Sequence, residues 1–285
     1  MLNKDKKFID LFNFELHKKL NINDEYISRK ATEEEYFIAY LYFISNCSYY
    51  SRFKYYNERT NFYITGKNLN NKINKWNKLK IFENIFNDTS NIYCESRDRS
   101  NFKYLSEDTL FVPNRMCNKS EVGRCVYYKS KNGIKIDVIV DVSGAPLDIS
   151  IASGNQNDAT IAKNRIPIIA NKINAVKYKD SQKYKTIILG DVIYDNEKLK
   201  QIIKDNDMDS IMAPNKRNTK DLEKLKNKNL SHKHKQKLKK RHIVENCFSW
   251  LTQYTPRFYR VFTRNAFNFL NEVYIIATKI ILAKF

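Results

Sequence analysis

Glycine and proline are scarce in this sequence, which has six glycines and five prolines among 285 residues. That scarcity excludes collagen-like chains and flexible glycine-rich linkers. A disordered chain is excluded as well, because hydrophobic residues make up 42% of the sequence and aromatic residues 13%. A chain of this length can bury a substantial core, so we expect one or two folded domains.

Cysteine pairs and uninterrupted apolar runs are also missing. The five cysteines contain no Cys-x-x-Cys pair, so we expect reduced thiols in an intracellular protein and no disulfide framework. The N-terminus lacks the apolar centre of a secretory signal. The most apolar stretch, residues 266–283, is interrupted by polar and charged residues, which favours a buried helix and no membrane partner.

Positive charge, in contrast, is abundant. The chain has 51 Lys and Arg against 31 Asp and Glu, a formal net charge of +20. A bias toward Lys, Asn, Ile, Tyr and Phe is typical of an AT-rich genome and explains part of this charge, but a polyanionic partner is still the first prediction. Residues 215–241 hold twelve Lys or Arg and two acids. This segment predicts contacts with a DNA backbone, and the alternative is a solvated, lysine-rich loop.

Residues 1–100 have the pattern of helices. Thr32 and Glu35 form a capping-box signature before the apolar run 36–44. A second helix is predicted at about 68–87, with a turn at 64–67 between the two. This arrangement predicts either a helix-turn-helix or an ordinary helical domain. We therefore expect an N-terminal helical domain over residues 1–100, with DNA binding as a candidate role.

The pattern changes near residue 100, and five of the six glycines lie between 123 and 190. The sequence predicts strands at 105–112, 134–140, 147–151, 186–189 and 210–213, and helices at 158–176, 195–205, 240–253 and 266–283. The second and third strands predict an antiparallel pair, and the run 186–189 is typical of a buried central strand. We expect residues 101–285 to form an α/β domain, a mixed sheet flanked by helices, with 215–241 as a basic insertion.

Three acidic residues lie at positions where a role as an ordinary solvated surface residue does not explain them. Asp108 lies inside an apolar strand, Asp191 ends the buried strand, and Glu245 lies on the helix 240–253. Buried carboxylates are costly unless they are paired, hydrogen-bonded or bound to metal. Three of them gathered by one sheet would form a site for hard divalent cations. On composition alone, four other acids are equal candidates, namely Asp137, Asp141, Asp148 and Asp158.

The order of short motifs between about residues 36 and 283 resembles the DDE transposases of bacterial insertion sequences. Residues 108–112 resemble the strand with the first catalytic Asp, residues 190–195 the second-Asp motif, and residues 241–245 the segment with the catalytic Glu. Further similarity lies at 133–137, 140–147 and 152–158, and around Trp76. The resemblance implies a ribonuclease-H-like catalytic domain.

The same resemblance implies a chemistry. Asp108, Asp191 and Glu245 would bind two Mg²⁺ ions, with Mn²⁺ as a substitute, and catalyse DNA cleavage and strand transfer. The implied partners are double-stranded DNA, namely the terminal inverted repeats of the element and the target DNA, with a homodimer on the DNA. The implied location is intracellular and DNA-associated: cytoplasm or nucleoid, or the nucleus or a viral factory in a eukaryotic host. The side chains expected to contact DNA are Lys135, Lys239, Lys240, Arg241, Arg257, Arg260 and Arg264.

The chain departs from the family pattern at several positions. Leu238 and Thr252 stand where many relatives have Tyr and Lys, and Asn246 stands where an Arg often follows the Glu. Val192-Ile193 replaces the usual Lys-Gly after the second Asp. These departures keep two alternatives open: a non-catalytic DNA-binding protein derived from a transposase, and a ribonuclease-H-like nuclease without strand transfer.

Overall fold

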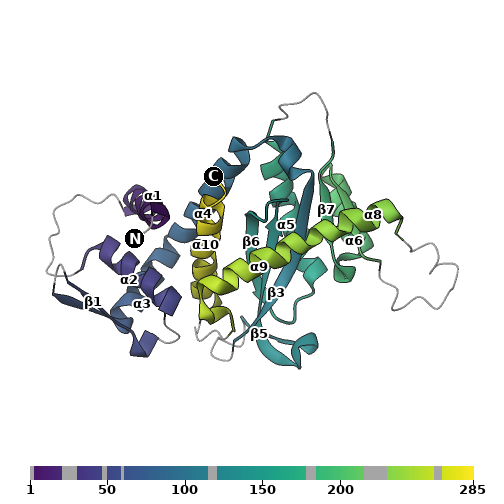
Figure 1. The fold of residues 1–285 in the computed structure, drawn as a ribbon. Coiled ribbons are helices and arrows are strands. Elements are labelled where there is room, and N and C mark those ends of the chain that lie inside the picture. Colours follow the sequence, from purple (N-terminus) through teal and green to yellow (C-terminus); the bar gives the residue numbers. More distant parts are fainter. Residues whose placement is uncertain are drawn as a thin grey trace.

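The structure is a computed structural model that describes residues 3–20, 31–46, 50–58, 61–114, 121–177, 184–214, 230–259 and 265–285. Its N-terminal region contains the helices α1 (Asn3–Leu20), α2 (Glu33–Asn46), α3 (Gly66–Lys78) and α4 (Ile81–Ser96). A hairpin of two short strands, β1 (Lys54–Asn57) and β2 (Phe62–Thr65), lies between α2 and α3. Figure 1 shows this region at one end of the molecule, beside the large sheet.

The predicted capping box at the start of α2 is confirmed. The Thr32 amide donates to Glu35 Oε2 at 2.7 Å, and the Glu35 amide donates to Thr32 Oγ1 at 3.2 Å. These reciprocal bonds satisfy amides that the first turn of a helix leaves without helical partners. The helix then places its apolar residues in the N-terminal core, where Phe37 stacks on Phe12 and meets the ring of Trp76.

Three expectations for this region are wrong. The single helix predicted at 68–87 is two helices, because Lys80 adopts a left-handed conformation with φ of 55° and redirects the chain between α3 and α4. The β1–β2 hairpin also separates α2 from α3, so these helices do not form a helix-turn-helix. The turn predicted at 64–67 is instead the junction of β2 and α3, where Thr65 caps the helix by accepting from the Asn68 amide.

Six strands form the large sheet: β3 (Tyr104–Pro113), β4 (Gly123–Cys125), β5 (Lys131–Val140), β6 (Pro146–Ser153), β7 (Ile187–Gly190) and β8 (Asp209–Met212). Their order is β4-β5-β3-β7-β8, and β6 pairs with the outer side of β5. The pairs β3–β5, β4–β5 and β5–β6 are antiparallel, whereas β3–β7 and β7–β8 are parallel. The predicted mixed α/β fold of the ribonuclease-H-like type is therefore confirmed, with β3 at the centre of the sheet.

Helices cover both faces of this sheet. Figure 1 shows α9 (Ile243–Tyr254) crossing one face, preceded by α8 (His232–Leu238) and the short turn η5 (Lys239–His242). On the opposite face lie α5 (Asp158–Asn174), which packs on β3, β5 and β6, and α6 (Glu197–Asp205), which contacts α5 and β8. The last helix, α10 (Ala266–Leu282), runs beside α4 between the N-terminal helices and the sheet.

The C-terminal helix joins the two halves of the chain. The Asn268 amide donates to Asn74 Oδ1 at 3.0 Å and the Asn271 amide to Asn77 Oδ1 at 2.5 Å, both across the α10–α3 contact. One hydrophobic core extends from α1 to α10. The division of the chain into domains at about residue 100 stays a prediction. Within the described ranges, none of the helices combines the length and the apolar character that crossing a bilayer requires.

Candidate active site

The centre of the sheet places the first two predicted carboxylates side by side. β3 and β7 pair in parallel with Ser106 opposite Leu189. Asp108 lies two residues further along β3, and Asp191 is the first residue after the end of β7. Neighbouring strands lie about 4.8 Å apart. Each carboxylate accepts the amide of the next residue, from Thr109 at 2.8 Å and from Val192 at 2.7 Å. In sheets with parallel strands, ligands bind at the carboxyl ends of those strands.

The third predicted carboxylate, Glu245, is linked to Asp108 by Arg241. Arg241 lies in η5, and its Nη1 donates to Asp108 Oδ2 at 2.7 Å while its Nη2 donates to Glu245 Oε1 at 3.0 Å. The side chain of Asp108 is 24% exposed and that of Glu245 is 50% exposed. Arg241, 133 positions after Asp108 in the sequence, therefore links Asp108 to Glu245 through one guanidinium group.

The electrostatics of this site favour a cation. Burial raises the pKa of Asp108, while the Thr109 amide and the Arg241 guanidinium lower it. The carboxylate of Asp191 raises the pKa again, because two like charges disfavour ionisation of either group. Arg241 supplies positive charge, but one guanidinium is shared between Asp108 and Glu245 while Asp191 adds a further negative charge.

These residues fit a divalent metal ion by their chemistry. Within the described ranges, no three His, Cys, Asp or Glu side chains converge closely enough to form a ready metal site. The Arg241 guanidinium, however, occupies oxygens of Asp108 and Glu245 as a hard divalent cation would. A metal ion at these oxygens would have to displace the Arg241 guanidinium from them.

Three of the four alternative acids have structural partners. Asp141 shapes the β5–β6 turn, where its Oδ1 accepts the amides of Ser143 and Ala145 at 2.8 and 2.9 Å. This turn includes Gly144, whose φ of 79° favours glycine. Asp148 forms an ion pair with Arg165. Asp158 accepts from Lys135 Nζ at 2.6 Å. These contacts explain their burial without a metal ion.

The fourth alternative, Asp137, belongs to a closed carboxyl pair with Glu107. Both side chains are fully buried on the face under α5, and none of their oxygens has a hydrogen-bond partner among the described residues. Burial raises both pKa values well above the usual range. Asp137 adds to the rise at Glu107, and Asp148 adds to the rise at Asp137. Sequence reasoning missed Glu107, although strand alternation places it on the face opposite Asp108.

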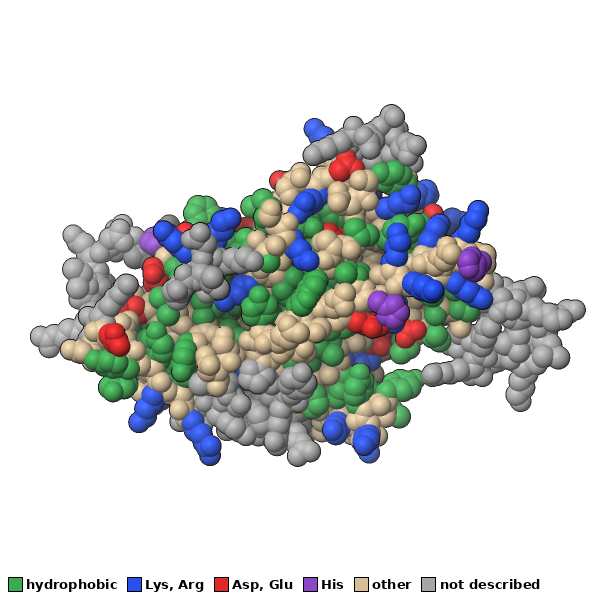
Figure 2. Space-filling view, viewed as in Figure 1, with side chains coloured by type: hydrophobic (Ala, Val, Ile, Leu, Met, Phe, Trp, Pro, Cys, Tyr) green, Lys and Arg blue, Asp and Glu red, His purple; other side chains and the backbone are tan. Residues whose placement is uncertain are grey.

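The residues expected to contact DNA fall into three groups. Lys239 and Lys240 are exposed at η5, next to exposed lysines of α8, and Figure 2 shows Lys and Arg side chains gathered over this part of the molecule. Lys135 is buried, and Arg257 is only 1% exposed because it pairs with the buried Glu272, so neither offers a surface to DNA. Arg260, Arg264 and residues 215–229 of the basic segment lie outside the described residues.

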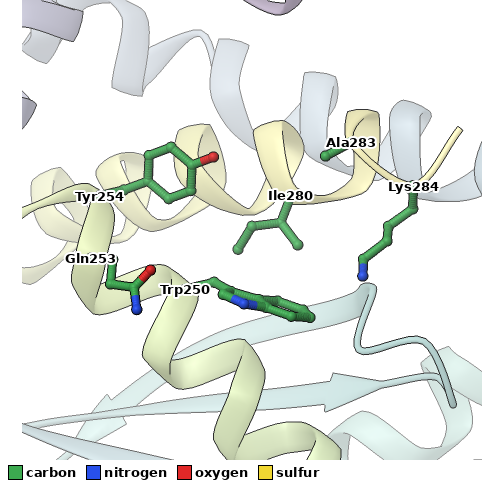
Figure 3. A pocket seen from close by; sticks show the side chains of 6 residues that line it. All are labelled: Trp250, Gln253, Tyr254, Ile280, Ala283 and Lys284. Atoms are coloured by element: carbon green, nitrogen blue, oxygen red, sulfur yellow. The ribbon is translucent and has the colours of Figure 1, made fainter.

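A separate cavity of about 440 Å³ lies between α9 and the end of α10. Figure 3 shows the rings of Trp250 and Tyr254 on its wall, with Lys284 opposite. The Lys284 ammonium lies 4.4 Å from the centroid of the Trp250 ring, a cation–π contact. Trp250 follows Glu245 by five residues, which is about 140° around a helix. The cavity is therefore separate from the carboxylates.

Comparison with known protein families matches residues 123–280 to the transposase DDE domain. The match covers more than half of the chain and includes Asp191 and Glu245, while Asp108 lies before it. Among curated proteins, none matches the chain. A solved structure with a related arrangement is the piggyBac transposase synaptic complex with hairpin DNA, determined by cryo-EM, with a TM-score of 0.48 and 11% sequence identity, covering 97% of this chain and 71% of that chain. The chain belongs to the family of DDE transposases.

Proposed function

We propose that this protein cuts DNA at the ends of a mobile element and joins those ends to target DNA by metal-dependent phosphoryl transfer. The observation that carries the proposal is the placement of Asp108 on β3 and of Asp191 directly after the parallel neighbouring strand β7, with Glu245 on the same guanidinium as Asp108. Membership of the DDE transposase family supports it.

Each side chain has a defined part in this proposal. Asp108 and Asp191 would hold Mg²⁺, or Mn²⁺ in its place, with their orientation fixed by the amides of Thr109 and Val192. Glu245 would complete the ligand set from α9. Two bound ions would stabilise the attacking and leaving oxygens of an in-line displacement. Arg241 pairs with both Asp108 and Glu245 and offsets part of their negative charge when no ion is bound.

The proposed partner is double-stranded DNA, first the terminal inverted repeats and then the target, bound by a homodimer. The net charge of +20 and the exposed lysines of α8 and η5 support it, because each neutralised phosphate adds sequence-independent affinity. Arg260, Arg264 and the basic segment 215–241 extend the proposed DNA surface, and the region 1–100 is its second DNA-binding part. The proposed place of action is wherever the element DNA lies in the cell.

The test is cleavage of labelled terminal-repeat DNA by purified protein with Mg²⁺ and with a chelator. We expect Mg²⁺-dependent cleavage that is lost in Asp108→Asn, Asp191→Asn and Glu245→Gln. The matched control is Asp205→Asn, an exposed carboxylate at the end of α6, which keeps activity. Equal cleavage by all three site variants and the wild type would show that the chemistry lies elsewhere.

The same assay separates the two alternatives. A non-catalytic DNA-binding protein would bind the repeat in chelator and would not cleave it with any cation, as the departures at Asn246 and Thr252 allow. A nuclease without strand transfer would cleave but produce no joined molecules, which a two-substrate product assay detects.

A further inference from the structure

The cavity between α9 and α10, of about 440 Å³, takes no part in the proposed DNA chemistry. Its lining comes from the ends of these two helices, namely Trp250, Gln253, Tyr254, Ile280, Ala283 and Lys284. Ligand sites for small molecules in proteins have volumes of about 300–1,000 Å³. The cavity therefore has the size of a site for one small molecule.

The aromatic wall of the cavity is held in place by the β5–β6 turn. A Cβ atom on Gly144 would lie 2.9 Å from Cζ3 of Trp250, so the indole ring packs directly against the backbone of that turn. The turn is itself fixed, because the carboxylate of Asp141 accepts the amides of Ser143 and Ala145. Trp250 therefore has a defined position before any ligand binds.

The opposite wall is fixed as well (Figure 3). The carbonyl oxygen of Lys284 accepts from Arg97 of α4, and the amide of Lys284 donates to the carbonyl of Ile281 at 2.8 Å. Ile280 is buried and adds an aliphatic surface. Because both walls are preformed, a ligand does not have to order the backbone around it, which lowers the cost of binding.

The charge in the cavity has no acidic partner. Lys284 alone among the lining residues is charged. Its ammonium lies 4.4 Å from the centroid of the Trp250 ring, and no carboxylate in the described part of the chain forms an ion pair with it. A cation–π contact positions the ammonium but does not neutralise it. An anion in the cavity would therefore gain a charge-assisted hydrogen bond.

The rest of the lining selects the shape of that anion. Tyr254 is 44% exposed, and its ring lies with Trp250 and Ile280 on the cavity wall, which suits a flat apolar group. A nucleic-acid strand carries a phosphate at every nucleotide and would find a single cation here. The chemistry fits a compound with one aromatic ring system and one negative charge.

We propose that this cavity binds a small aromatic carboxylate, with its ring against Tyr254 and Trp250 and its carboxylate on the Lys284 ammonium. Such a ligand contacts α9 and α10 together and stabilises their packing, because it binds only the folded arrangement. Since α9 also carries Glu245, the site offers a way to act on the helix that holds one proposed metal ligand. The binding itself needs neither DNA nor a metal ion.

The test is calorimetric titration of the purified protein with 2-naphthoate and with 2-naphthamide, in chelator and without DNA. The two probes share one ring system, and only the first is charged. We expect 2-naphthoate to bind about tenfold more tightly, because a hydrogen bond to a charged group is stronger than one between neutral groups. Equal affinities, or no binding of either probe at millimolar concentration, would overturn the proposal.

Two variants assign the parts of the ligand. Lys284→Met keeps the aliphatic stem and removes the charge, so it should bind 2-naphthoate about tenfold more weakly and leave 2-naphthamide unchanged. Tyr254→Ala removes aromatic surface from an exposed position and should weaken both probes. Lys103→Met is the matched control, because the Lys103 ammonium also lies over a ring, 4.9 Å from the centroid of Tyr184, but lies outside this lining. It should bind both probes as the wild type does.

The variants and two competitors also define how the proposal fails. Wild-type affinity of Lys284→Met for 2-naphthoate, or an equal loss in Lys103→Met, would show that Lys284 is not the anion site. Displacement of 2-naphthoate by a short oligothymidylate would identify the cavity as a DNA contact. Tighter binding of a capped phenylalanyl-aspartate dipeptide than of 2-naphthoate would assign it to a protein partner. Each of these results overturns the proposal, and none depends on whether the protein cleaves DNA.

Discussion

Glu107 and Asp108 are neighbours on the central strand, yet they meet opposite conditions. The side chain of Glu107 points under α5 and is fully buried with Asp137, and no described residue donates a hydrogen bond to either carboxyl. Asp108 points to the other face, where it accepts from Thr109 and Arg241 and where the Asp191 carboxylate adds to the rise of its pKa. An acidic residue in an apolar strand therefore does not indicate a metal site by itself. The charged and hydrogen-bonding partners on its own face of the sheet decide whether it is suited to bind a metal ion.

The difference has an electrostatic consequence. The closed face is the face of the sheet under α5. There, burial and mutual repulsion raise the pKa values of Glu107 and Asp137 well above the usual range, which favours the protonated, neutral form of both groups. On the open face, which is the face of the sheet that holds Asp108 and Arg241, the Arg241 guanidinium and the Thr109 amide lower the pKa of Asp108 against the effect of burial.

The largest expected effect is the loss of DNA cleavage when a carboxylate of the open face is changed, compared with a change on the closed face. Asp191→Asn should lower the rate of DNA cleavage by about a thousandfold or more, because the loss of metal-ion stabilisation removes several kcal/mol from the transition state. Asp137→Asn, on the closed face, should change the rate by less than about tenfold. Single-turnover cleavage of terminal-repeat DNA measures both, and equal losses would erase the distinction between the faces.

The next effect compares an unpaired buried carboxyl with a paired one. Glu272 is fully buried and accepts from Arg257 Nε at 2.6 Å. Arg257→Met should lower the free energy of unfolding by about 3–5 kcal/mol, because it leaves a buried charge alone. The double variant Arg257→Met/Glu272→Met should recover most of that loss in urea denaturation. A single variant as stable as the wild type would mean that Glu272 is already neutral, like Asp137.

A pH-dependent effect follows for the closed face. The raised pKa of Asp137 means that the folded state holds its proton more tightly than the unfolded state does. The resulting stability is complete below the unfolded pKa, about 3.9, and is lost as the pH rises toward the folded pKa. Asp137→Asn removes this loss, so it should raise the melting temperature more at pH 8 than at pH 5. Thermal unfolding at both pH values measures the effect, and a gain that shrinks with pH would contradict it.

The smallest effect concerns the arginine of the open face. Arg241→Gln should lower stability by about 1 kcal/mol without metal, because the pair with Asp108 is partly exposed. It should also tighten Mn²⁺ binding, since the competing guanidinium is gone. Calorimetric titration with Mn²⁺ checks the second point, and weaker binding by the variant would show that Arg241 supports the metal site instead of competing for it.

Much of the sheet was predictable from the sequence because its strands are long or strongly apolar. The alternation along 134–140 predicted β5, and Ile139, which breaks that alternation, is explained by burial of β5 on both faces. The β1–β2 hairpin was missed because its strands have four residues each and follow a region with helical patterns. The break at Lys80 was missed because neither glycine nor proline marks it.

The candidate site was predictable only in part. The motifs around Asp108, Asp191 and Glu245 named the residues, but spacing along the chain could not reveal that Arg241 pairs with Asp108, 133 positions before it, as well as with Glu245. Nor could composition separate Asp108 from Asp137, since both lie in buried strands. That separation needs the register of β3 with β5 and β7, which sets the face of every side chain.

The most direct test of the account is Mn²⁺ binding followed by electron paramagnetic resonance. Wild-type protein should bind Mn²⁺, and Asp108→Asn and Asp191→Asn should each abolish or greatly weaken that binding, while Asp137→Asn binds as the wild type does. Binding that survives both open-face changes, or that is lost with Asp137→Asn, would contradict the claim that the open face of the sheet is the metal site.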